Sequence, residues 1–253
     1  MGESPEPSAG RGDLRLLEVD LETCFVLADG RCIERENDPG GSRGPSVAFA
    51  GCEEGNVFAI HADVGPAARA AILALAACET GWRGDALPAC VPKIVDLLAA
   101  EAPAPTVVPG LIYALPRGAR FAHGARIVRG GEAAGEALVE RLARQGLPRS
   151  LLDMGFVGVE DFWAPWCAAT VDGEIASIAF AARLGEAGAE IGVATRPEFR
   201  GRGLAAAVTA AWSALPRLAN RALFYSTQAT NLSSRRVTSR LGLRLIGRSV
   251  RVG

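Results

Sequence analysis

The chain has 253 residues, 49% of them hydrophobic, and a formal net charge of −1. This is enough apolar sequence for one large core or two small ones, which excludes a disordered chain. No apolar run approaches the roughly 20 residues that cross a bilayer, and residues 1–13 are acidic, polar and rich in glycine and proline, unlike a secretory signal. We expect a soluble cytoplasmic protein with a disordered tail over residues 1–13.

The cysteines and histidines give no sign of a disulfide framework or a metal site. None of the six cysteines forms a C-x-x-C pair, and most lie beside apolar residues, as small buried side chains do. Neither His61 nor His123 has a second ligand-type residue at helical or hairpin spacing. We therefore expect no bound metal, and we interpret His61 as a satisfied polar residue of a strand rather than as a base.

Short strands and helices over residues 14–103 predict a small α+β domain, in which no chemistry is recognisable. Asp29-Gly30 predicts a hairpin over residues 24–33, and a second strand pair is expected at 46–50 and 56–61. Helices are expected after Pro66 and over 91–100. Ala102-Pro103-Ala104-Pro105 is typical of a linker, so a second domain is expected over residues 106–253.

The first half of this second part is predicted to hold strands at 111–115 and 125–128 and a helix over 132–145. Phe162, Trp163 and Trp166 follow, and we interpret them as core packing, with a substrate pocket as the alternative. Asp172-Gly173 predicts a hairpin between strands 167–171 and 175–181. A further strand is expected over 188–195.

Helices and strands are also expected to alternate over residues 204–252. A helix over 204–215 is ended by Pro216, and the apolar run 222–226 is typical of a central strand. Asn231 suits the N-cap of a helix that reaches Leu241, and a strand over 245–252 is expected to close the sheet. Together these signals predict an α/β or α+β architecture.

The stretch 189–205 carries the clearest chemical signal. It brings Gly201 and Gly203 to the start of an alanine-rich helix, where an anion can approach the backbone and is attracted by unpaired amides and the helix dipole. From Arg196 to Gly253 there are eleven arginines and one acidic residue, Glu198. These features predict a phosphate or pyrophosphate site, although an ordinary solvated arginine surface is the alternative. Nucleic acid is not favoured, because exposed aromatic residues are not interleaved with the arginines.

The glycines also satisfy the loose dinucleotide pattern G-x-G-x-x-A over residues 201–206. That fold places its first glycine directly after a strand and an acidic residue at the end of the next one. Here residues 196–200 intervene, and the next strand ends in Tyr225-Ser-Thr-Gln228 without a carboxylate. The pattern therefore does not predict a dinucleotide fold.

Glu190 is the candidate general base. In a strand it shares its face with Gly192 and Ala194, which offer almost no side chain, so its carboxylate is expected to overlook open space. Partial burial would raise its pKa toward the range that suits proton transfer. A solvent-exposed strand glutamate is the alternative.

Two motifs give the chain a family resemblance over about residues 125–253. Arg200, Gly203 and Ala205 match the signature Arg/Gln-x-x-Gly-x-Gly/Ala of the GNAT superfamily of N-acetyltransferases. Asn231-x-x-Ser234, followed by Leu241-Gly242-Leu243, is similar to a second motif of that superfamily. The resemblance implies a mixed, mostly antiparallel central sheet flanked by helices, here preceded by the smaller N-terminal domain, and acetyl-CoA as co-substrate.

The resemblance also implies roles for individual residues. The backbone of Val193, Ala194 and Thr195 would contact the pantetheine arm, and Asn231 and Ser234 would lie near its thiol end. The pyrophosphate would be cradled by the amides of Arg200, Gly201, Arg202, Gly203, Leu204 and Ala205. Glu190 corresponds to the glutamate that some members use as base.

One departure concerns the general acid. Many members have a tyrosine seven residues after the asparagine, where this chain has Thr238. Tyr225 is either its substitute or a packed strand residue. The prediction is an acetyl-CoA-dependent N-acetyltransferase acting by direct attack on the amine of a small molecule or peptide. A catalytically inactive acyl-CoA-binding sensor and a nucleic-acid binder are the alternatives.

Overall fold

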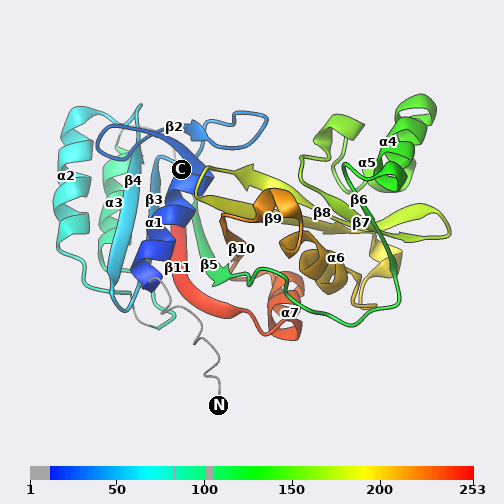
Figure 1. Cartoon of the computed structure of the whole chain (residues 1–253). Coiled ribbons are helices and arrows are strands. Elements are labelled where there is room, and N and C mark those ends of the chain that lie inside the picture. Colours follow the sequence, from blue (N-terminus) through cyan, green and yellow to red (C-terminus); the bar gives the residue numbers. More distant parts are fainter. Residues whose placement is uncertain (1–11, 83, 101–104) are drawn as a thin grey trace, which may run out of the picture.

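The structure is a computed structural model that describes residues 12–82, 84–100 and 105–253. Eleven strands form one sheet in the order β1-β2-β4-β3-β11-β5-β10-β9-β8-β7-β6, with helices packed on both of its faces (Figure 1). Neighbouring strands are antiparallel, except that β2–β4 and β10–β9 are parallel. The predicted fold class, a mixed and mostly antiparallel sheet flanked by helices, is confirmed.

The N-terminal part contributes three helices and four strands. In chain order they are α1 (Asp13–Cys24), β1 (Phe25–Ala28), β2 (Cys32–Glu36), β3 (Val47–Cys52), β4 (Gly55–His61), α2 (Pro66–Ala77) and α3 (Cys90–Ala99). Both predicted strand pairs and the helix after Pro66 are confirmed. Helix α1 was not predicted, and it begins at Asp13, the last residue assigned to the tail. Residues 1–11 of that tail lie outside the described residues.

The C-terminal part supplies the other seven strands. In chain order its elements are β5 (Val107–Ala114), β6 (Arg126–Arg129), α4 (Ala133–Gln145), α5 (Arg149–Leu152), β7 (Cys167–Val171), β8 (Glu174–Leu184), β9 (Gly188–Thr195), α6 (Leu204–Ser213), β10 (Ala222–Gln228), α7 (Leu232–Arg240) and β11 (Arg244–Val252). The expectation that the last strand closes the sheet is wrong, because β11 lies between β5 and β3. Ile246, Val250 and Val252 of β11 are buried, which suits a strand that is paired on both edges.

The sheet runs across the boundary that the sequence predicts between two domains. Val252 of β11 pairs with Val47 on one side and with Val107 on the other. One apolar core combines Leu17 of α1 with Phe224 of β10. Most of the predicted linker lies outside the described residues, so the division into domains stays a prediction.

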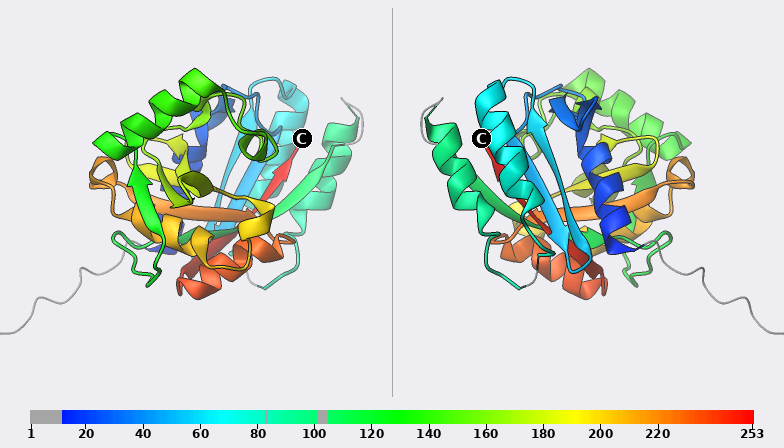
Figure 2. Two further views of the ribbon diagram at one scale, coloured as in Figure 1. Left: turned by 90° about the vertical axis from the view of Figure 1, so that its right-hand side faces the viewer. Right: turned by 90° about the vertical axis from the view of Figure 1, so that its left-hand side faces the viewer.

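Helix α1 covers one face of the central strands. Leu17, Leu21 and Cys24 are spaced at four and three residues, which puts them on one side of the helix, where all three are buried. Helices α2 and α3 lie on the other side of β3 and β4 (Figure 2). In the part of the chain that the structure describes, no helix has both the length and the apolar character needed to cross a bilayer.

Candidate functional site

Strands β9 and β10 pair over only three residues. Ala222, Leu223 and Phe224 of β10 lie opposite Gly188, Ala189 and Glu190 of β9. Beyond this point β9 stays paired with β8, and β10 stays paired with β5. The two strands therefore part in the middle of the sheet, and a cavity lies on each face beside the gap.

The cavity on the α6 side has a volume of about 590 Å³ and collects most of the predicted binding residues. Its lining includes Val193, Ala194, Thr195, Arg200, Gly201, Gly203, Leu204, Ala205, Asn231 and Ser234. Of the predicted residues only Arg202 is outside the lining. Its guanidinium lies over the Phe199 ring at 5.0 Å, and its carbonyl accepts a hydrogen bond from His123 Nε2 at 2.8 Å.

The turn at this cavity requires its glycines. Gly201 and Gly203 have φ angles of +80° and +83°, in the left-handed region that residues with a Cβ rarely adopt. Gly203 is the N-cap of α6, and a Cβ there would come within 3.3 Å of the Phe121 ring. The first turn of a helix leaves its amides without intrahelical acceptors. The cavity therefore meets the positive end of α6.

A second helix begins at the same cavity. The Asn231 side chain caps α7 by accepting the Ser234 amide at 3.1 Å, as predicted for an N-cap. Arg200, Arg236 and Arg240 also line the cavity, and none of them forms an ion pair with a carboxylate of the described residues. Two helix N-termini and three uncompensated arginines make this an attractive environment for phosphate groups.

Several other arginines of the C-terminal segment 196–253 are already paired with carboxylates. Arg196 pairs with Glu174 and Glu198, and Arg248 pairs with Asp85. Arg244 pairs with Asp13 and Arg251 with Glu36, two carboxylates from the opposite end of the chain.

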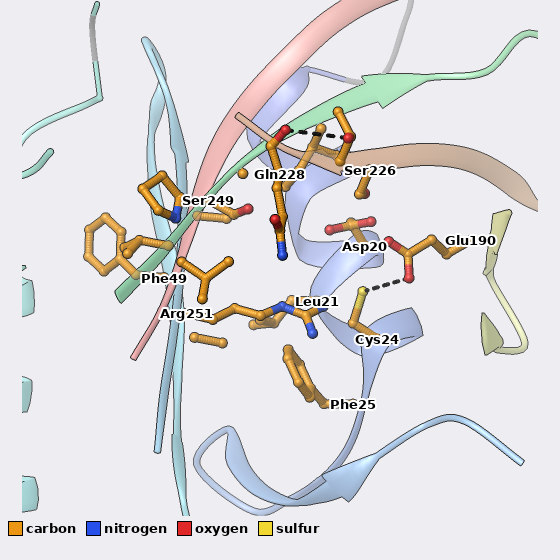
Figure 3. A pocket seen from close by; sticks show the side chains of 18 residues that line it. Asp20, Leu21, Cys24, Phe25, Phe49, Glu190, Ser226, Gln228, Ser249 and Arg251 are labelled. Carbon is orange, nitrogen blue, oxygen red and sulfur yellow. Dashed lines mark hydrogen bonds between the residues drawn. The ribbon is translucent and has the colours of Figure 1, made fainter. Parts of the chain in front are cut away.

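The cavity on the α1 side is smaller, with a volume of about 210 Å³, and Glu190 lies in its wall. Figure 3 shows the carboxylates of Glu190 and Asp20 close together, with Arg251 and Gln228 reaching into the same cavity. Apolar residues form much of the remaining wall, among them Leu21, Phe25, Ile112 and Val250.

Glu190 is 5% exposed, so the alternative of a solvent-exposed glutamate is wrong. Its Oε2 accepts hydrogen bonds from Arg183 Nη1 at 2.8 Å and from the Cys24 thiol at 3.8 Å. The open space expected on its face is only partly present. The Phe180 ring packs on Gly192, where a Cβ would come within 2.5 Å of it, so the free volume lies toward α1 instead.

The comparisons with known proteins agree with this geometry. Residues 137–248 match the family model of the GNAT acetyltransferases. These residues form a GNAT acetyltransferase domain. The match spans the gap between β9 and β10, the glycine turn and Glu190. A comparison with curated protein sequences found no match.

Solved structures of the GNAT family are also similar to the chain. A GNAT-family protein from Novosphingobium aromaticivorans is 25% identical over 59% of this chain and 67% of its own, with a TM-score of 0.39. A GNAT-family acetyltransferase from Colwellia psychrerythraea is 13% identical over 95% of both chains, with a TM-score of 0.42. A GCN5-related N-acetyltransferase from Kribbella flavida is 18% identical over 64% of this chain and 63% of its own, with a TM-score of 0.42. The assignment depends on the family model and not on these weaker likenesses.

Within the GNAT domain, Tyr225 and Thr238 differ in their access to the α6-side cavity. Tyr225 lines it, directly after the last residue of β10 that pairs with β9. Burial raises the pKa of Tyr225, and a hydrogen bond with the Ser234 side chain only partly opposes this rise. Thr238 is 3% exposed and donates its hydroxyl hydrogen to the Arg235 carbonyl at 2.8 Å. Its hydroxyl is therefore engaged in its own helix.

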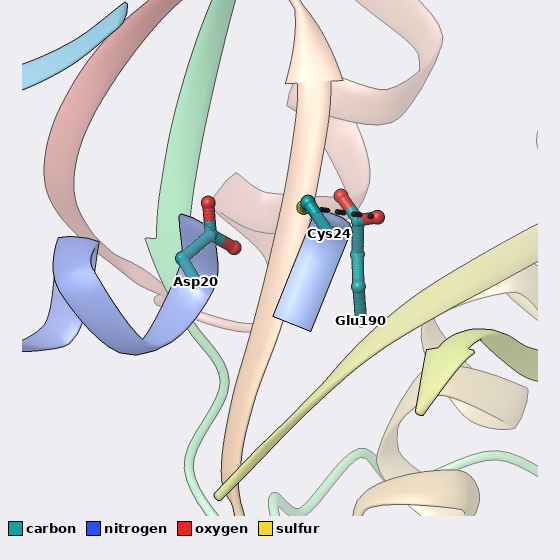
Figure 4. Close-up of side chains that lie close together, drawn as sticks. All are labelled: Asp20, Cys24 and Glu190. Carbon is teal, nitrogen blue, oxygen red and sulfur yellow. Dashed lines mark hydrogen bonds between the residues drawn. The ribbon is translucent and has the colours of Figure 1, made fainter. Parts of the chain in front are cut away.

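Asp20 is the residue of this region that the sequence analysis missed. It comes from α1, is 5% exposed, and lies beside Cys24 and Glu190 (Figure 4). Burial raises the pKa of Asp20 to about 8, and the charge of Glu190 contributes to the rise. The signal that could have found it is the spacing of Leu17, Leu21 and Cys24, which predicts a helix with Asp20 near its buried side.

The ligand atoms of Asp20, Cys24 and Glu190 lie within 4.8 Å of one another, a spacing that a metal ion could bridge. Two features oppose this use. Arg183 already occupies the Glu190 oxygen, and burial raises the pKa of the Cys24 thiol well above its usual value, which disfavours a thiolate ligand.

The aromatic residues Phe162, Trp163 and Trp166 of the same domain pack against other aromatic rings. Phe162 and Trp166 are 4% and 5% exposed and belong to an apolar cluster with Phe156. Trp163 meets the Phe180 ring edge to face at 5.7 Å. The interpretation of Phe162 and Trp166 as core packing is confirmed.

Proposed function

We propose that the chain is an acetyl-CoA-dependent N-acetyltransferase that transfers the acetyl group directly to a primary amine of a small molecule or peptide. The observation that carries the proposal is the gap between β9 and β10, with an electropositive cavity on one face and a carboxylate-lined cavity on the other. Such an arrangement allows two substrates to approach one point of the sheet from opposite sides.

The α6-side cavity is the proposed coenzyme site. The amides of residues 200–205 and the start of α6 would hold the diphosphate, and Arg200, Arg236 and Arg240 would balance its charge. Beyond Glu190, none of the described residues forms a strand paired with β9 on the β10 side. Backbone groups of Val193, Ala194 and Thr195 would bind the pantetheine amides there, with Asn231 and Ser234 near its thiol end.

The amine would enter from the α1-side cavity. Glu190 accepts the proton that the nitrogen loses as it attacks the thioester carbonyl, and backbone donors near Val193 polarise that carbonyl. The C–N bond forms, the C–S bond breaks, and Tyr225 donates its proton to the leaving sulfur. Tyr225 is protonated at neutral pH, as an unshifted tyrosine would also be, and its raised pKa does not change this.

A catalytically inactive acyl-CoA sensor is the second candidate, and Thr238 at the position of the usual tyrosine favours it. The nucleic-acid alternative has less support, because four of the eleven arginines pair with carboxylates.

The test combines two measurements on the wild-type chain. Calorimetric titration with CoA measures binding, and thiol release from acetyl-CoA is followed with small amines, amino acids, aminoglycosides and peptides. Binding with thiol release that depends on an amine supports the transferase. Binding without release for any amine supports the sensor, and the absence of CoA binding refutes both.

A further inference from the structure

One carboxylate oxygen of Asp20 has no partner among the described residues. Its Oδ1 is buried and makes no hydrogen bond with any of them, although the side chain lines the α1-side cavity. A buried acceptor that lacks a donor is costly, and such groups are rare in native structures. A donor supplied by a ligand in this cavity would satisfy it.

The other acidic groups around the cavity already have cationic partners. Glu190 pairs with Arg183, and Glu36 pairs with both Arg183 and Arg251. Asp20 forms no ion pair within the described residues. It is therefore the carboxylate that is available to an incoming cation.

The size of the cavity limits what that cation can be. Its volume of about 210 Å³ is below the 300–1,000 Å³ that is typical of sites for drug-sized ligands. Leu21, Phe25 and Ile112 line it beside the carboxylates. An amino group on a short apolar chain fits both the charge and the walls, whereas a polycyclic or branched polyamine does not.

We infer that Asp20 binds the amino group of the acceptor through its free Oδ1, opposite Glu190, and that the acceptor is a small, unbranched primary amine. This inference rests on the proposed acetyltransferase function and specifies its acceptor. Asp20 is then a catalytic residue in addition to the family motifs, contributed by a helix outside the matched domain.

The two carboxylates divide the proton transfers. The acceptor arrives as an ammonium ion, which donates to Oδ1 of ionised Asp20 and passes one proton to it. The neutral amine attacks the thioester, and the proton that it loses on forming the C–N bond goes to Glu190. Tyr225 protonates the sulfur as the C–S bond breaks and is reprotonated from Glu190 through solvent. One proton is released per turnover, from Asp20.

The surroundings of Asp20 support this division. Burial and the charge of Glu190 of β9 raise the pKa of Asp20, whereas Arg251 of β11 and Arg183 of β8 lower it, and the Cys24 thiol lies one helical turn away. The result is a carboxylate more basic than usual and therefore better matched to an ammonium ion. Ionisation of Asp20 is needed for binding, so activity should rise with pH through this group.

The test uses Asp20→Asn in the full chain, with butylamine as acceptor and acetyl-CoA as donor. Asp13→Asn is the matched control, because it makes the same change on the same helix away from the cavity. We expect kcat/KM for butylamine to fall on the order of 100-fold in Asp20→Asn, with the CoA affinity unchanged and Asp13→Asn equal to the wild type. The rise of kcat/KM with pH that Asp20 causes should be absent in Asp20→Asn and present in Asp13→Asn.

The outcomes separate this inference from the proposed function. If the wild type releases thiol with butylamine and Asp20→Asn stays within twofold of it, the role of Asp20 is refuted while the transferase stands. A wild type that prefers an aminoglycoside to butylamine refutes the small acceptor. A wild type that releases no thiol with any amine removes the proposed function and this inference with it. Asp20→Ser provides a second variant, should the asparagine perturb folding.

Discussion

Phe224 of β10 lies opposite Glu190 of β9, and this is the last pairing between the two strands. Successive side chains along a strand point to opposite faces of the sheet. Tyr225 consequently belongs to the core under α6, and Phe224 to the core under α1. One register position thus sets the candidate acid and the candidate base on opposite sides of the same gap.

Gly201→Asp should abolish most CoA binding. The new carboxylate would stand among the amides that are proposed to hold the diphosphate, and like charges brought together cost several kcal/mol. We expect the Kd for CoA to rise about 100-fold, or roughly 3 kcal/mol, by calorimetric titration. Gly173→Asp is the matched control, since both glycines have φ of +80° and no atom of the described residues lies within 4 Å of a Cβ at either position. Equal affinities in the two variants would refute the phosphate cradle.

Tyr225→Phe should lower kcat and leave CoA affinity nearly unchanged. The variant keeps the ring that packs under α6 but removes the proton for the leaving sulfur, so we expect a loss of about 10- to 100-fold in kcat. Tyr113→Phe is the control, because Tyr113 pairs directly with Tyr225 on the adjacent strand. Steady-state kinetics with saturating acetyl-CoA measures kcat for both variants. An unchanged kcat in Tyr225→Phe would show that Tyr225 is not the general acid.

Glu36→Gln should destabilise the fold strongly. Glu36 is 7% exposed and pairs with Arg183 and Arg251, so its loss leaves one mostly buried and one partly exposed guanidinium group with less compensation. Breaking a buried charge pair typically costs about 3–5 kcal/mol. Urea denaturation of Glu36→Gln and of Glu34→Gln, an exposed glutamate on the same strand, gives the comparison. A loss in Glu36→Gln no larger than that in Glu34→Gln would contradict the structural role of this network.

Stability should depend on pH through Asp20. Its pKa rises from 3.8 to about 8 on folding, so between these values the native chain binds a proton that the unfolded chain releases. The stabilisation is complete below about pH 4 and is lost as the pH rises to about 8. Thermal melts should show the wild type losing stability across this window, relative to Asp20→Asn, by on the order of a few kcal/mol. Parallel curves for the two proteins would show that Asp20 titrates normally.

Much of the C-terminal fold could be predicted because its signals are local. Asp172-Gly173 specifies a tight turn, Asn231 caps a helix through its own side chain, and Pro216 ends the helix before it. The turn at Gly201 and Gly203 could be predicted for the same reason, because the two glycines directly precede the first residue of α6. Ten of the predicted binding residues line one cavity accordingly.

The environment of Glu190 could not be predicted, because it depends on contacts between distant segments. Glu190, Arg183 and Glu36 meet only when β2, β8 and β9 are in place around α1. Helix α1 was not predicted because it directly follows a polar segment, although the spacing of its apolar residues is helical. The position of β11 inside the sheet likewise depends on pairing with residues about 200 positions earlier in the chain, which no local pattern specifies.

A crystal structure with acetyl-CoA bound is the decisive experiment for the proposed coenzyme site. We expect the diphosphate on the amides of residues 200–205, the pantetheine beside β9 from Val193 to Thr195, and the acetyl group at the gap beyond Phe224 and Glu190. A coenzyme bound elsewhere, or a turn at Gly201 and Gly203 that stays closed to it at saturating concentration, would contradict the assignment of this site.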